Sequence, residues 1–142
     1  METVNDSEKP QIKIANRKLR NKTSKKCSHL YLQEKFLKNI PKYPISKDVV
    51  VLYLFNNEIT EINNLNAFPN LTSLYLQNNK IERMENLKNI NNLKKLYIGH
   101  NKISVLEGLE DFSNLEELHI EKQYLPDNNP LCVDPRSIYC IS

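Results

Sequence analysis

Apolar residues recur along this chain with a period of 22 residues. Units begin at Cys27, Val49, Leu71, Leu93 and Leu115, and apolar side chains stand at offsets 1, 4, 6, 11, 14, 17 and 20 within them. The unit that begins at Leu71 shows the full set, namely Leu71, Leu74, Leu76, Ile81, Met84, Leu87 and Ile90. Because a single unit of this size cannot bury its own apolar residues, the repeat predicts coils stacked into a solenoid.

The spacing changes within each unit, and with it the predicted local structure. Offsets 4 and 6 alternate with polar or aromatic residues, which is typical of a strand of about five residues with one buried face. The later apolar residues recur every third position, which favours a 3₁₀ or irregular return segment. Asn57, Asn79 and Asn101 stand at offset 9, where the chain must turn. An Asn amide donates and accepts hydrogen bonds, so these three can satisfy buried turn backbone.

The outward face of the predicted strands carries an unexpected row of aromatic residues. Offset 5 reads Tyr31, Tyr53, Tyr75, Tyr97 and His119, and the row would span roughly 19 Å at the usual strand separation. Aromatic side chains favour strand pairing, but an exposed aromatic stripe also marks a protein-binding surface. The candidate partner-binding residues are Tyr31, Val51, Tyr53, Phe55, Tyr75, Gln77, Lys95, Tyr97, Glu117, His119 and Glu121.

Phe55 favours partner contact over a purely structural role, because it interrupts a polar column and gains nothing from exposure unless it is covered. Glu117, His119 and Glu121 share the outward face, but side chains two apart on one strand need a third element to close a metal site. A charged contact edge is the preferred interpretation. No nucleophile–base signature is present, and two glycines in 142 residues disfavour phosphate-binding loops. We expect no enzyme, no cofactor and no small-molecule substrate.

The two ends depart from the repeat and set the domain boundaries. Residues 1–26 carry eight Lys or Arg and three acids, which predicts a basic flexible leader. Residues 27–125 form the repeats, although Lys35 and Gln123 replace Asn at offset 9. Residues 126–142 contain Pro126 and Pro130, so we expect an irregular segment, truncated before further repeats and a cap.

Composition agrees with an intracellular repeat protein. There is no apolar run of about 20 residues and no signal segment, so no membrane association is expected. Three cysteines are too few and too irregular for a disulfide framework, which favours a reducing compartment. Cys27 occupies a core offset and is predicted to be a small buried side chain.

The strings "LYLFNNEITEINNL", "LTSLYLQNNKIERMENL" and "LKKLYIGHNKISVLEGLE" resemble leucine-rich repeats of the 22-residue type. That subfamily is typified by the repeat-type regulatory subunit of protein phosphatase 1, and it includes a dynein light chain and a spliceosomal protein. The resemblance implies an α/β right-handed superhelix with short parallel strands on the concave face and 3₁₀ or irregular return segments on the convex face.

The same resemblance implies a function and a location. It implies a non-catalytic protein-binding scaffold that regulates protein phosphatase 1, with the phosphatase catalytic subunit as partner, in the cytoplasm at the centrosome and microtubule cytoskeleton. A dynein or axonemal adaptor is one alternative, with tubulin or dynein components as partners. An RNA-associated scaffold of the spliceosomal type is the other, with the basic leader touching nucleic acid, although nucleic acid is the less favoured partner.

Overall fold

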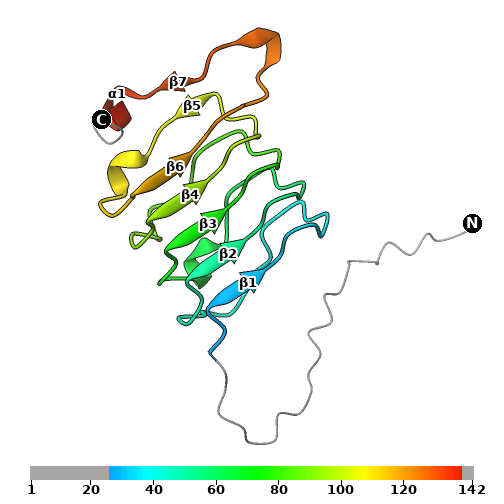
Figure 1. Ribbon diagram of the computed structural model, residues 1–142, viewed down its shortest axis with the longest axis vertical. Coiled ribbons are helices and arrows are strands. Elements are labelled where there is room, and N and C mark those ends of the chain that lie inside the picture. The colour runs from blue at the N-terminus through cyan, green and yellow to red at the C-terminus, as the bar shows by residue number, and fades with distance from the viewer. Residues whose placement is uncertain (1–25, 139–142) are drawn as a thin grey trace, which may run out of the picture.

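The computed structural model describes residues 26–138, which form a solenoid of stacked coils with one strand per coil on a common side (Figure 1). The five sheet strands are β1 (His29–Tyr31), β2 (Val51–Tyr53), β3 (Ser73–Tyr75), β4 (Lys95–Tyr97) and β6 (Glu117–His119). Neighbouring strands are parallel, and each residue pairs with the residue 22 positions later, as Tyr53 does with Tyr75. The predicted parallel solenoid is confirmed, with paired strands of three residues instead of about five.

The core lies between the sheet and the return segments. All seven apolar positions of the units that begin at Val49, Leu71 and Leu93 are buried. Short 3₁₀ helices η1 (Leu65–Ala67) and η2 (Leu109–Asp111) lie on two of the return paths, as the sequence predicts. Since each coil packs against its neighbours, the hydrophobic burial is shared along the stack.

The asparagines at offset 9 hold each coil to the one before it. Asn79 Nδ2 donates to the carbonyl oxygens of Leu54 and Leu76, both at 3.0 Å. Its Oδ1 accepts a hydrogen bond from the backbone N–H of Ile59 at 3.0 Å. Asn101 repeats this pattern one coil later with Leu76, Ile98 and Ile81. These side chains thus satisfy backbone groups of the turn that would otherwise be buried without a partner.

We call Asn57, Asn79 and Asn101, with their hydrogen bonds, the asparagine ladder. Each side chain of the ladder bonds to the coil before its own, which bears on the two units that have Lys35 or Gln123 at offset 9. Asn57 accepts hydrogen bonds from the backbone N–H groups of Lys35 and Leu37 in the preceding coil. Lys35 stands at offset 9 of the first described coil. Within residues 26–138 there is no preceding coil whose backbone its side chain would have to bond. Gln123 keeps the pattern, because its amide accepts from Ile103 and donates to Ile98 and Ile120.

Two further positions in each coil require a left-handed backbone. At offset 8, Asn56, Asn78 and His100 have φ between 55° and 57°. At offset 16, Asn64 and Asn86 have φ of 56° and 58°, and Gly108 takes the same place with φ of 74°. Asn tolerates this conformation better than most residues, and Asn64 and Asn86 also donate to the preceding coil.

The C-terminal part of the described chain is more regular than the sequence predicts. After the short 3₁₀ turn η3 (Pro126–Asn128), strand β7 (Cys132–Val133) pairs in parallel with β5 (Val105–Leu106) on the return side. One helical turn, α1 (Pro135–Ile138), then lies beside η2. Ser137 is fully buried there, accepting from the Leu109 backbone N–H at 3.3 Å and donating to Glu110 at 3.2 Å. The sequence predicts an irregular segment here, whereas the structure has a short strand pair and one helical turn.

Two other expectations concern the chain ends. Cys27 is exposed, so the prediction of a buried side chain is wrong, because no coil packs against that side of the first unit in the described structure. The leader predicted for residues 1–26 lies outside the described residues except for Lys26, which approaches Asp48 at 3.7 Å. Within residues 26–138, no helix has the length and apolar character needed to cross a bilayer.

Substitution of Asn101 by Ala tests the ladder. Three backbone groups would lose their partner in a fully buried turn, so the free energy of unfolding should fall by about 3 kcal/mol. The matched control is Asn92→Ala, because Asn92 is exposed and donates a single 3.3 Å hydrogen bond to the Pro69 carbonyl. Urea unfolding followed by circular dichroism measures both. Equal losses in the two variants would contradict the ladder's role.

Candidate protein-binding face

The outward side chains of the five sheet strands form what we call the sheet face, and a stack of five rings runs across it. The ring stack consists of Tyr31, Tyr53, Tyr75, Tyr97 and His119. Neighbouring ring centroids are 4.8, 4.8, 4.7 and 4.3 Å apart in that order, and the ring planes differ by 4° to 17°. The sequence-predicted aromatic row is therefore one continuous stack.

The geometry of the ring stack follows from the repeat. In-register pairing places the same offset of each unit side by side, at about the 4.8 Å separation of neighbouring strands. Offset stacking of aromatic rings contributes about 0.5–1.5 kcal/mol per pair, so the stack stabilises the coils that carry it. Stacking leaves the ring edges and hydroxyl groups on the surface, where Tyr31 is 57% exposed.

The N-terminal end of the sheet face is aromatic and apolar. Phe55 packs edge-on against Tyr53, with ring centroids 6.3 Å apart and planes at 87°. The His29 ring lies 6.3 Å from the rings of both Tyr31 and Tyr53, a neighbour that sequence reasoning did not include among the candidate residues. Val51 is half-buried at the same end. Three of these rings and Val51 thus lie on the paired strands β1 and β2, with the Phe55 ring just after β2, so this end of the sheet face is mainly aromatic.

The C-terminal end of the sheet face is charged. Lys95 Nζ lies 2.6 Å from one carboxylate oxygen of Glu117, and the Tyr97 hydroxyl donates to the other at 2.6 Å. The Glu121 carboxylate lies over Gly99, in the space that a side chain would occupy: a Cβ added there would stand 2.8 Å from Glu121 Oε1. The face therefore changes from aromatic to charged along the stack.

These contacts shift the titration of three groups. The hydrogen bond from Lys95, followed by that from Tyr97, holds the pKa of Glu117 below its usual value. The same carboxylate raises the pKa of Tyr97 through the hydrogen bond that it accepts, and it raises the pKa of Lys95. Burial is the main cause that raises the pKa of Tyr53.

The structure places the residues singled out in the sequence at two locations. The eight strand residues among them share the sheet face with Phe55 and Glu121, whereas Asn57, Asn79 and Asn101 lie in the buried turn. Gln77 is half-buried, and its Oε1 is shielded without a hydrogen-bond partner in residues 26–138.

Across residues 26–138 no group of three His, Cys, Asp or Glu side chains is placed to hold a metal. Glu117 is instead held by Lys95 and Tyr97, and His119 stacks on Tyr97.

The family of the chain follows from its repeats. The family model described as "Leucine Rich repeats (2 copies)" matches residues 48–89, and the model described as "Leucine rich repeat" matches residues 69–125. The two matches overlap and together cover the central coils, which agrees with the parallel solenoid of the structure. Residues 48–125 of this chain therefore consist of leucine-rich repeats.

Two solved structures show the same architecture. An internalin (inlF) from Listeria monocytogenes strain 4b F2365 is 30% identical, with a TM-score of 0.51 over 56% of this chain and 24% of that one. An internalin C2 from the same strain is 25% identical, with a TM-score of 0.55 over 64% of this chain and 40% of that one. This chain thus spans less than half the length of either internalin. No curated protein matches the chain.

The pKa of Tyr97 tests the charged end of the sheet face. The pKa of Tyr97 in the folded protein is raised above its ordinary value by the hydrogen bond to Glu117. This hydrogen bond is therefore intact below the ordinary tyrosine pKa, and it is lost as pH rises through the raised pKa of Tyr97. Glu117→Gln removes the carboxylate charge, so Tyr97 should ionise at lower pH. Tyrosinate absorbance during an alkaline titration measures this, with Tyr97→Phe identifying the Tyr97 step. Tyr53, whose pKa is raised mainly by burial, should not move. Superimposable titrations of wild type and Glu117→Gln would contradict the contact.

Proposed function

We propose that this chain is a non-catalytic protein-binding scaffold that holds its partner on the sheet face. The observation that carries the proposal is the cluster of aromatic rings at the N-terminal end, where Phe55 packs edge-on against the ring stack. Tyr contributes a large contact area at low entropy cost and keeps a hydroxyl for hydrogen bonds, so it is favoured in protein interfaces. The charged end supplies polar contacts that fix orientation.

The proposed partner is the catalytic subunit of protein phosphatase 1. The repeat spacing resembles that of the phosphatase regulatory subfamily, and the segment from "QYLP" to "DPRSI" (residues 123–138) resembles the testis leucine-rich-repeat protein. That protein is a phosphatase-1 regulatory subunit associated with microtubule-organising centres. We therefore propose a regulatory subunit of phosphatase 1 in the cytoplasm, at the centrosome and microtubule cytoskeleton.

The sequence also favours docking through the repeats. Many phosphatase-1 partners use a short basic–hydrophobic–x–aromatic motif, and this chain lacks one. A repeat-mediated contact then has to supply the affinity, and the sheet face carries the aromatic residues typical of binding hot spots. On this model the phosphatase covers Phe55 and the neighbouring rings.

A pull-down of purified phosphatase-1 catalytic subunit tests this proposal with a double variant, Phe55→Ala with Tyr75→Ala. Loss of both rings should weaken binding about tenfold or more, because interface hot spots are mostly aromatic. The matched control is Val105→Ala with Tyr124→Ala, which removes an exposed aliphatic and an exposed tyrosine outside the five-stranded sheet. Circular dichroism verifies that both variants fold.

Three outcomes are informative. Selective loss in the sheet-face variant supports the proposal. Unchanged binding by a folded sheet-face variant would exclude the sheet face as the site. Failure of the wild-type chain to bind phosphatase 1 would overturn the choice of partner, and retention of dynein or tubulin components, or of RNA, from a lysate would then favour one of the alternative scaffolds.

A further inference from the structure

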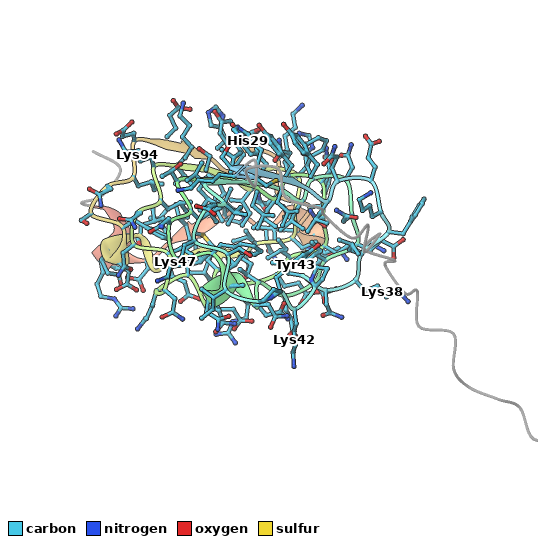
Figure 2. The ribbon with its side chains drawn as sticks, turned by 90° about the horizontal axis from the view of Figure 1, so that it is seen from below. His29, Lys38, Lys42, Tyr43, Lys47 and Lys94 are labelled. Atoms are coloured by element: carbon cyan, nitrogen blue, oxygen red, sulfur yellow. The ribbon has the colours of Figure 1, made fainter. Side chains whose placement is uncertain are left out.

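A groove on the first coil lies outside the sheet face. It is formed by the turn after β1, the start of the first return segment, and Asn63 and Asn64 of the second coil. Its other lining residues include Lys35, Phe36, Leu37, Lys38, Ile40 and Lys42. In Figure 2, Lys42 projects from the side of the solenoid opposite His29, which marks the sheet, and Lys38 lies at one edge of the solenoid, away from His29. We call this site the first-coil groove.

Phe36 is the most unusual residue of the groove. Its side chain is 82% exposed, and its backbone has φ of 55°, a left-handed conformation that is rare for a bulky residue. The central coils place charged residues at the equivalent offset, where Glu58 and Lys80 form an ion pair at 3.3 Å. The fold itself therefore gains little from an aromatic ring here, and strained, exposed positions of this kind are common at binding sites.

The charge around Phe36 has one sign. Lys35, Lys38 and Lys42 are exposed and form no ion pair within residues 26–138, and no acidic side chain lines the groove. Glu34, the nearest acid along the chain, accepts a hydrogen bond from Asn56. A groove that combines an apolar floor with three unpaired lysines is complementary to an acidic ligand.

The chain's own N-terminal segment does not fit as the occupant. Residues 1–25 carry seven Lys or Arg and three acids, a net charge of 7 − 3 = +4, which would repel the groove lysines. The same charge would help to attract an acidic partner. We propose that the first-coil groove binds an acidic peptide segment of a partner protein, with one large apolar side chain of that segment against Phe36 and Leu37.

The lining favours a peptide over RNA. Single-stranded nucleic acid is held by several aromatic rings on which successive bases stack, and the groove offers one aromatic ring among aliphatic, asparagine and lysine side chains. Its cations are lysines, which act as point charges and lack the planar fork with which arginine recognises phosphate. An acidic peptide with an apolar anchor uses both the lysines and the aliphatic floor.

The test is a titration of the whole chain with an acidic peptide that carries a central Trp–Leu pair. The chain has no tryptophan, so the peptide's indole is the only one present, and its emission should shift to the blue as it enters the groove. Lys38→Glu with Lys42→Glu should weaken binding about tenfold, since each change replaces an attraction with a repulsion. Lys88→Glu with Lys102→Glu is the matched control, with the same change in net charge at exposed sites elsewhere.

Phe36→Asn separates binding from folding. Asn tolerates the left-handed backbone, so the variant should be at least as stable as wild type in urea while it binds the peptide more weakly. A peptide with Ser in place of Trp and Leu, labelled at its end and followed by anisotropy, should also bind more weakly.

The proposal is overturned by absence of saturable peptide binding, by equal losses in the two lysine pairs, or by equal affinity of the Ser peptide. It is also overturned if an oligouridylate binds more tightly than the peptide and loses that binding in Lys38→Glu with Lys42→Glu, since the groove would then be an RNA site.

Discussion

The structure depends on the hydrogen bonds that asparagine side chains make at the turn after each strand. The chain there passes through the interior between two coils, where backbone N–H and C=O groups have no strand partner and no water. Asn79 and Asn101 each accept one hydrogen bond from the preceding coil and donate to carbonyl groups of both coils. Each amide therefore satisfies its own coil and fixes the distance and register of its neighbour.

The surface features follow from that fixed register. Strands that pair at a constant 22-residue step bring the same offset of each unit together, so a tyrosine repeated in the sequence becomes a ring stack in space. The residue at a given offset also differs between units, and these differences make one end of the sheet face aromatic and the other charged, as Phe55 and Glu117 show. The first coil differs because no described coil precedes it. Cys27 is exposed there, and Phe36 stands beside unpaired lysines.

The sequence predicts the repeated parts well, because burial and pairing impose a period on them. The core positions, the parallel strands, the offset-9 asparagines and the aromatic row all follow from the 22-residue step. The features that the sequence does not predict depend on local geometry that leaves no repeated pattern of residues. Gln123 looks like a break in the ladder, but its longer side chain reaches the same backbone groups. The pairing of β7 with β5 joins residues 27 positions apart, outside the repeat, and the left-handed backbone of Phe36 has no signature in its residue type.

Hydrogen exchange of the turn amides tests the asparagine ladder most directly. The backbone N–H groups of Ile59 and Ile81 donate to the side chains of Asn79 and Asn101, whereas those of Leu54 and Leu76 donate to backbone carbonyls of the next strand. If the asparagines hold the coils together, the turn amides should exchange within about tenfold of the rate of the Leu54 and Leu76 amides, because both open only when coils separate. Rapid exchange of Ile59 and Ile81 while the Leu54 and Leu76 amides stay protected would contradict the account.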